Sequence, residues 1–299
     1  MINNFIDIND YNKSQIDEII LIAKNIKKNP KKFSSVLKDK TLGMIFEKQS
    51  LRTRLSFNLG MKKIGGHVLE LSSKDIGFDN IREKSEDVLR VLSQFIDCLM
   101  IRNNDHKKLV DLSNQKIIPI INGLTNYSHP CQILGDFLTI QEKIKNFQNC
   151  TITWIGDFNN VLISLLQLQN IYLFELKVVI PSKILKSNQK QIKKFKNKKN
   201  EFISDPKLGA LKTDCIMTDV WLSMGEKNKN KIKYFKNFTV NDKILNIASK
   251  KVIFMHCLPA KRGQEVTSKV LDGKHSVVLE QAKNRMYIQQ AILIYVLKK

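Results

Sequence analysis

The chain has 299 residues, of which 42% are hydrophobic and 26% charged, the composition of a globular protein with room for two domains. No apolar run reaches the roughly 18 residues that a membrane-spanning helix needs, and the first residues lack the basic and apolar regions of a signal peptide. Five cysteines, an odd number, do not favour a disulfide framework, so we expect a protein of the reducing cytoplasm.

The net charge of +22 permits two interpretations. Such a charge is typical of proteins that bind nucleic acid. The lysines, however, are spread over the chain, and the densest run, residues 183–199, contains one aromatic residue, Phe195. Without interleaved aromatic residues for base stacking, this run is more typical of a solvated helix face. A basic nucleic-acid-binding protein is the alternative from another functional class.

The first half of the chain alternates between apolar runs and helical patterns. An amphipathic helix is expected over residues 11–27, with Ser14 available as its cap. Further helical patterns cover residues 55–64 and 86–95. Buried strands are expected at residues 42–46, 68–71, 97–101 and 117–121.

The second half repeats this alternation without an obvious repeat in sequence. Strands are expected at residues 151–155, 177–180, 215–218 and 252–255, and helical regions at 161–173, 181–200 and 282–297. The pattern predicts an α/β fold with two domains, each a mostly parallel sheet flanked by helices. We place the domains at residues 1–147 and 148–299.

The run Phe46-Glu47-Lys48-Gln49-Ser50-Leu51-Arg52-Thr53-Arg54 lies between a predicted strand and a predicted helix. The start of a helix has unpaired N–H groups and a positive dipole end, which favour an anion. Ser50 and Thr53 add hydroxyl groups, while Arg52 and Arg54 add charge and forked hydrogen bonding. A capped, solvated helix start is the simpler interpretation of one such arginine. Two arginines and two hydroxyls together favour a phosphate site.

Polar residues also follow other predicted strands, where ligands of open α/β sheets collect. Arg102 ends one strand, and His129 precedes Pro130, which suits a first helical position. The positive end of that helix lowers the pKa of the imidazole and keeps it a neutral donor that can polarise a carbonyl. A surface arginine and a capping histidine are the structural alternatives.

Three further runs carry polar chemistry at strand ends. Residues 156–160, Gly-Asp-Phe-Asn-Asn, lack the glycines of a dinucleotide fingerprint and suit a helix cap. Asp219 and Ser223 suit an ammonium group, or Asp219 caps the next turn. His256 beside Cys257 is a weak zinc signal, because no spaced Cys or His pair accompanies it.

These runs resemble the signatures of the aspartate/ornithine carbamoyltransferase family. The first resembles its carbamoyl-phosphate signature, with Leu51 where the family has Thr, and residues 129–136 resemble His-Pro-x-Gln-x-Leu-x-Asp. Residues 156–160 resemble Gly-Asp-x-Asn-Asn, with Phe158 where Gly is usual. Residues 219–225 and 256–259 resemble the signatures of ornithine-type members, since aspartate-type members have Leu at the position of Cys257. Asn284-Arg285 resembles the family's Asn-Arg in the last helix.

The resemblance implies roles for individual residues. The catalytic residues are expected to be Arg102, His129 and Cys257. Ornithine is expected to be bound by Asn160, Asp219, Ser223 and Met224. Carbamoyl phosphate is expected to be bound by Ser50, Leu51, Arg52, Thr53, Arg102, His129, Gln132, Cys257, Leu258 and Arg285.

The resemblance also implies an activity and an assembly. We expect transfer of a carbamoyl group from carbamoyl phosphate to L-ornithine, giving citrulline and phosphate, in arginine biosynthesis or breakdown. No metal or other cofactor is expected. The family further implies a cytoplasmic homotrimer whose domains close on substrate and whose last helix returns to the first domain. A carbamoyltransferase for another amine, such as putrescine, is the nearest alternative.

Overall fold

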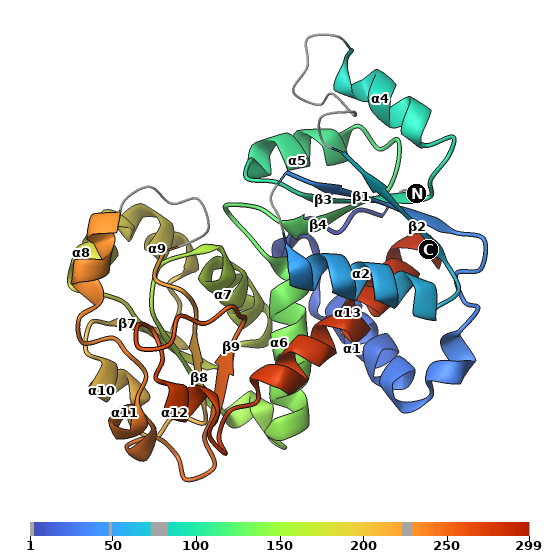
Figure 1. Cartoon of the computed structure of the whole chain (residues 1–299). Coiled ribbons are helices and arrows are strands. Elements are labelled where there is room, and N and C mark those ends of the chain that lie inside the picture. Colours follow the sequence, from blue (N-terminus) through green and yellow to red (C-terminus); the bar gives the residue numbers. More distant parts are fainter. Residues whose placement is uncertain (1–2, 48–49, 73–82, 223–228, 299) are drawn as a thin grey trace. The chain divides into compact units, whose positions relative to one another are not determined.

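The computed structural model describes residues 3–47, 50–72, 83–222 and 229–298 (Figure 1). The chain divides into two compact units. Unit 1 comprises Met1–Gly135 with Asn284–Lys299, and unit 2 comprises Asp136–Lys283. Each unit contains one parallel sheet with helices around it, so the predicted α/β class is confirmed.

The sheet of unit 1 has the strand order β2-β1-β3-β4. Its strands are β1 (Thr41–Phe46), β2 (His67–Leu71), β3 (Cys98–Arg102) and β4 (Ile120–Leu124). The central strand β3 is buried throughout, as its apolar sequence requires, whereas the edge strand β2 is partly exposed. The pairing of β1 with β3 places Phe46 opposite Arg102, so the segments that follow both strands start side by side.

The helices of unit 1 include two that continue into unit 2. They are α1 (Lys13–Lys28), α2 (Leu51–Lys63), α4 (Ser85–Leu92), α5 (His106–Asn114) and the unit 1 parts of α6 (Pro130–Lys143) and α13 (Val278–Lys298), with 3₁₀ helices η1 (Ile8–Asp10) and η2 (Pro30–Phe33). The predicted return of the last helix to the first domain is confirmed: in unit 1, Gln290 Nε2 donates to the carbonyl of Gly60 in α2 at 3.1 Å. A Cβ atom on Gly60 would lie 3.3 Å from Gln290 Cγ, which explains a glycine at this helix crossing.

The sheet of unit 2 has the strand order β7-β6-β5-β8-β9. Its strands are β5 (Thr151–Ile155), β6 (Glu175–Val179), β7 (Asn200–Ile203), β8 (Cys215–Thr218) and β9 (Ile253–His256). The pairing of β8 with β9 places Thr218 opposite His256. Asp219 and Cys257 therefore follow two strands that end at the same level.

The helices of unit 2 are mostly short. They are α7 (Asn160–Tyr172), α8 (Ser182–Ser187), α9 (Gln189–Phe195), α10 (Pro206–Ala210), α11 (Asp242–Asn246) and α12 (Ser268–Leu271), with 3₁₀ helices η3 (Phe147–Asn149) and η4 (Lys229–Phe235). The helix α7 is buried from Val161 to Gln169, which explains why its sequence is apolar on every face. None of the helices that the structure describes is long and apolar enough to cross a membrane.

Several predicted bounds were wrong. Residues 181–200 form α8 and α9, and residue 200 begins the edge strand β7, which we did not predict. The strand predicted at residues 117–121 begins at Ile120, directly after Pro119, which has no N–H for a sheet. The cap of α1 is Asn12, which accepts from Gln15 N, rather than Ser14.

Candidate active site

The segment after β1 forms a capped helix start, and the helix begins at Leu51, four residues before the predicted bound. Ser50 is the N-cap of α2, its Oγ accepts from Thr53 N at 3.4 Å, and it donates to Thr53 Oγ1 at 2.8 Å. Leu51 is the first residue of the helix and is 69% exposed. The first-turn N–H groups of this 13-residue helix and its dipole favour a bound anion.

Two buried arginines converge on Thr53 from distant parts of the chain. Arg102 Nη1 donates to Thr53 Oγ1 at 3.0 Å, and Arg285 Nη2 donates to the same oxygen at 2.5 Å. The other arm of Arg285, Nη1, donates to Gln132 Oε1 at 2.9 Å. With Ser50, three donors face one hydroxyl oxygen that has two lone pairs. A phosphate or carbonyl oxygen is an acceptor that suits these donors.

The packing of α6 against α13 determines where Arg285 lies in unit 1. A Cβ atom on Gly135 would lie 3.2 Å from Arg285 Cα, so this close approach requires a residue without a side chain. Because Gln132 lies on the same helix as Gly135, the approach also brings Gln132 to the guanidinium group.

His129 lies directly before α6 and is buried. Burial, and then the charges of Arg285 and Arg102, hold the pKa of its imidazole well below the ordinary value of 6.5. The predicted direction is correct, and burial is the largest cause of the lowered pKa, followed by the two arginine charges. The imidazole is therefore neutral at neutral pH and can donate a hydrogen bond without titrating.

The two arginines of the first signature have different environments. Arg54 forms an ion pair with Glu70 at 2.7 Å, and its guanidinium lies 4.9 Å from the centre of the Phe46 ring. Arg52 is half-buried in the first turn of α2. Of the two, Arg54 is thus held by other protein groups, whereas Arg52 stays a predicted phosphate ligand.

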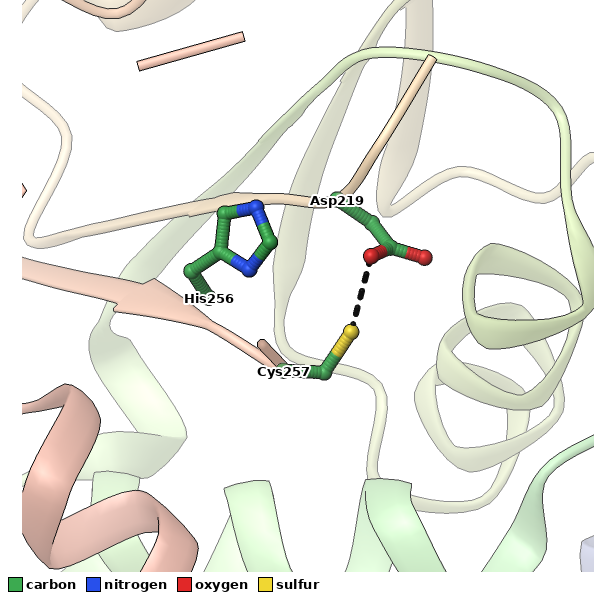
Figure 2. Close-up of side chains that lie close together, drawn as sticks. All are labelled: Asp219, His256 and Cys257. Carbon is green, nitrogen blue, oxygen red and sulfur yellow. Dashed lines mark hydrogen bonds between the residues drawn. The ribbon is translucent and has the colours of Figure 1, made fainter. Parts of the chain in front are cut away.

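In unit 2 the ends of β8 and β9 form a second cluster. The Cys257 thiol donates to Asp219 Oδ1 at 2.9 Å, as Figure 2 shows. The other carboxylate oxygen, Asp219 Oδ2, accepts from Asn159 Nδ2 at 2.8 Å. Asn159 is the N-cap of α7, and its Oδ1 accepts from Val161 N and Leu162 N, so its amide orientation is determined by the helix.

His256 lies beside this cluster, and its two ring nitrogens already have partners. Nδ1 accepts from Leu258 N at 2.8 Å, and Nε2 lies 3.1 Å from Oε1 of the buried Glu265. Asp219, His256 and Cys257 each have one atom that could bind a metal ion, and these three atoms lie within 4.8 Å of one another. Because hydrogen bonds occupy the imidazole nitrogens, we do not interpret this group as a metal centre.

The prediction for the ornithine-binding residues is only partly covered by the described residues. Ser223 and Met224 lie outside the described residues. Asn160 is the first residue of α7 and half-buried, and its role stays a prediction. Phe158, where the family usually has Gly, is not among the described residues with positive φ, so the loop accommodates it without that strain.

Sequence reasoning missed two contributors to the second cluster. Asn159 appeared only as a helix cap, although its amide also reaches Asp219. Glu265 did not stand out, because a single Glu in a polar loop gives no signal that it is fully buried against a histidine.

Two family models together match most of the chain. Residues 3–142 match the family model described as "Aspartate/ornithine carbamoyltransferase, carbamoyl-P binding domain". Residues 148–296 match the one described as "Aspartate/ornithine carbamoyltransferase, Asp/Orn binding domain". The chain belongs to the aspartate/ornithine carbamoyltransferase family.

Relatives within this family are similar over the full length. An ornithine carbamoyltransferase of Ruthia magnifica is 41% identical over 302 residues, covering 99% of this chain and 100% of the relative. The crystal structure of ornithine carbamoyltransferase from Burkholderia thailandensis has a TM-score of 0.88 at 32% identity and covers 99% of both chains. That of the anabolic enzyme from Campylobacter jejuni has a TM-score of 0.88 at 35% identity, covering 99% of this chain and 100% of that chain.

Proposed function

We propose that this carbamoyltransferase transfers the carbamoyl group of carbamoyl phosphate to the δ-amine of L-ornithine, giving L-citrulline and phosphate. The observation that carries the choice of acceptor is the Cys257–Asp219 pair of unit 2. Cys257 stands where aspartate-type members of the family have Leu. A thiol and a carboxylate suit a cationic amine better than they suit the carboxylate side chain of aspartate.

The donor site that we propose lies in unit 1. The phosphate of carbamoyl phosphate would accept from the first turn of α2 and from Ser50, Arg52 and Thr53. Arg102 and His129 would donate to the carbamoyl oxygen, and Gln132 would accept from the carbamoyl nitrogen. Support comes from the two guanidinium groups that share Thr53 Oγ1 and from the depressed pKa of His129.

The acceptor site that we propose lies in unit 2. Asp219 and Asn160, with Ser223 and Met224, would hold the α-amino end of ornithine and line its pocket. Cys257 and the backbone of Leu258 would face the reacting groups. The hydrogen bond of Leu258 N to His256 supports a defined orientation of this turn.

In the reaction, the neutral δ-amine forms a bond to the carbamoyl carbon, and the bond from that carbon to the phosphate oxygen breaks. The amine loses one proton, which balances the charge on the departing phosphate, and hydrogen phosphate leaves. Negative charge grows on the carbonyl oxygen and on the leaving phosphate, where buried arginines stabilise it more strongly than water does. Correct placement of two small substrates supplies much of the remaining rate.

We also propose a cytoplasmic homotrimer. The exposed side of α2 carries Leu55 and Leu59, which lie four residues apart and form an apolar patch. All five cysteines are free thiols, which suits a reducing compartment. Sedimentation analysis of the purified protein would test the oligomeric state, with a monomer as the contradicting result.

The experiment that tests the function is a citrulline-formation assay with the purified protein. Activity is expected with carbamoyl phosphate and ornithine, and Arg102→Ala should abolish it because one of the two convergent guanidinium groups is removed. A matched control is Arg262→Ala, whose guanidinium pairs with Asp272 on the surface of unit 2. Absence of citrulline with the wild-type protein would contradict the proposal.

A further inference from the structure

Three segments of unit 1 meet beside His129. They are the N-terminal segment with Asp7, the start of α5 with His106, and the turn after β4 that begins at Thr125. Thr125 and Ser128 are fully buried, and His129 follows Ser128 directly. The conformation of this turn therefore determines the backbone position from which the His129 side chain extends.

The Thr125 side chain organises this turn. Its Oγ1 accepts from Ser128 N at 3.1 Å and from Tyr127 N at 3.3 Å. The backbone closes the turn with a bond from Thr125 N to Ser128 O at 2.9 Å. The same Oγ1 lies 2.9 Å from His106 Nδ1, and the His106 ring packs on the Tyr127 ring with centroids 4.8 Å apart.

The hydrogen bonds of Thr125 Oγ1 indicate which ring nitrogen of His106 carries the hydrogen. A hydroxyl has two lone pairs and one proton, and the two backbone N–H groups occupy the lone pairs of Thr125 Oγ1. The hydroxyl proton then points to His106 Nδ1 at 2.9 Å in preference to Ser128 O at 3.4 Å. This assignment makes Nδ1 the acceptor and leaves the ring hydrogen on Nε2, towards Asp7 Oδ2, 3.4 Å away.

This arrangement also connects the loop that follows Arg102 with the loop that precedes α6 and contains His129. Asn103 N donates to Leu124 O at 3.1 Å, and Asn126 N donates to Asn104 O at 3.3 Å. The His106–Thr125 bond adds a side-chain link between the same two loops. The spacing of Arg102 and His129 thus depends on the hydrogen bonds between these two loops.

We propose that His106, oriented by Asp7, is a positioning residue that holds the Thr125 turn and thereby places His129 against the carbamoyl oxygen. The proposal rests on the proposed function for its kinetic consequence, whereas the hydrogen-bond arrangement itself is independent of any activity. Its action is through Thr125, so it is not a catalytic residue.

Two pairs of variants separate positioning from simple stability. Thr125→Val removes the hydroxyl with little change of volume, whereas Thr125→Ser keeps it. His106→Gln can place an amide N–H where Nε2 lies but loses the acceptor, whereas His106→Asn can place an amide oxygen where Nδ1 lies. His275→Gln is the matched control in unit 2, where His275 Nδ1 bonds to Val252 O at 2.8 Å.

We expect kcat to fall by about 10-fold or more in Thr125→Val and His106→Gln, because small displacements of a group at the reacting centre are costly. The KM for ornithine should stay within about twofold, because ornithine is held by unit 2 in the proposed function. Thr125→Ser, His106→Asn and His275→Gln should retain kcat within about threefold of the wild type. A Thr125→Val variant that melts earlier but retains kcat at a temperature where it is folded would overturn the proposal.

A spectroscopic measurement completes the test without use of activity. In protein labelled with ¹⁵N-histidine, the His106 signals, identified by their loss in His106→Asn, should show a protonated Nε2 and an unprotonated Nδ1. The His129 signals should shift in Thr125→Val and not in Thr125→Ser. A proton on Nδ1 of His106 would overturn the inference even if citrulline forms. So would His129 signals that are the same in Thr125→Val as in the wild type. Inactive wild-type protein with the expected signals would instead contradict the proposed function alone.

Discussion

Cys257 Sγ and Asp219 Oδ1 lie 2.9 Å apart at the ends of two neighbouring strands. Their proximity follows from the register of β8 and β9. Thr218 pairs with His256, and Asp219 and Cys257 are the residues that follow this pair. Asn159 holds the other oxygen of Asp219 from the start of α7. Three strand ends of one sheet therefore contribute to one polar group, the place where ligands of parallel sheets bind.

Removing the thiol should weaken the reaction of ornithine. In Cys257→Ala, we expect kcat/KM for ornithine to fall by about 10- to 100-fold, the range of a hydrogen bond to a charged group. Steady-state kinetics with varied ornithine would measure this fall. The control is Cys150→Ala, at a buried thiol just before β5. Equal kinetics of the two variants would argue against a role of Cys257 in the reaction.

The guanidinium group of Arg285 should not be replaceable by the ammonium group of lysine without loss of activity. Its two terminal nitrogens donate separately to Thr53 and to Gln132, a planar fork that the compact ammonium group of lysine does not reproduce. We expect kcat/KM for carbamoyl phosphate to fall by about 100-fold in Arg285→Lys, as loss of a charge-assisted bond predicts. Arg90→Lys, at an exposed arginine paired with Glu86 in α4, should leave it unchanged. Comparable losses in both variants would contradict this account.

A threonine at residue 51, as the family has, should strengthen the binding of carbamoyl phosphate. Leu51 is exposed at the first position of α2, so Leu51→Thr costs little packing. One added hydrogen bond to phosphate predicts a KM for carbamoyl phosphate lower by about 2- to 10-fold. Leu21→Thr, at an exposed position of α1, serves as the control. An unchanged or higher KM in Leu51→Thr would show that the missing hydroxyl is irrelevant.

The buried His129 should make the fold sensitive to acid. Its pKa is lowered in the folded state, so below its ordinary value of 6.5 the unfolded chain binds a proton that the folded chain does not bind. The free energy of unfolding therefore falls as the pH falls below about 6.5, with a slope that approaches about 1.4 kcal/mol per pH unit. Above that pH, His129 contributes no pH dependence.

The difference between the wild type and His129→Gln isolates this contribution. Urea unfolding at about pH 5 and about pH 7.5 should show a steeper loss of stability in acid for the wild type than for the variant. A difference between the two proteins that does not change with pH would contradict the assignment.

Cys257 should be the most reactive of the five thiols. Burial raises the pKa of Cys131 and of Cys150 to about 12, and also raises the pKa values of Cys98 and Cys215. Cys257 is the one cysteine that is not buried. Because the thiolate is the reactive form, iodoacetamide should label Cys257 first, as peptide mass spectrometry would show. Ornithine with carbamoyl phosphate should slow the labelling. Faster labelling of any other cysteine would contradict this prediction.

Much of the fold could be predicted because buried parallel strands have continuous apolar sequences. Residues 151–155 and 215–218 were predicted with the bounds that the structure shows. The edge strand β7, Asn-Glu-Phe-Ile, was missed because it is half exposed and directly follows the lysine-rich run at residues 183–199. Its strand character comes from pairing with β6, a tertiary effect that a local pattern does not contain.

For the site, the sequence identified polar strand ends but not their contacts. The order of strand, polar turn and helix around Ser50 was predicted, because it depends on neighbours in the chain, although the N-cap role of Ser50 was not assigned. The convergence of Arg102 and Arg285 on Thr53 joins residues that are 49 and 232 positions from it, and no local pattern encodes such a contact. Resemblance to the family pointed to these residues individually, whereas the shared oxygen emerged from the structure.

The most direct test of the account is an acceptor comparison with carbamoyl phosphate as the donor. The purified protein should form citrulline from L-ornithine at a kcat/KM well above the values for putrescine and for L-aspartate, since the second cluster joins Asp219 and Cys257. Equal or faster carbamoylation of putrescine would contradict the assignment of the acceptor, and faster carbamoylation of aspartate would contradict the role given to Cys257.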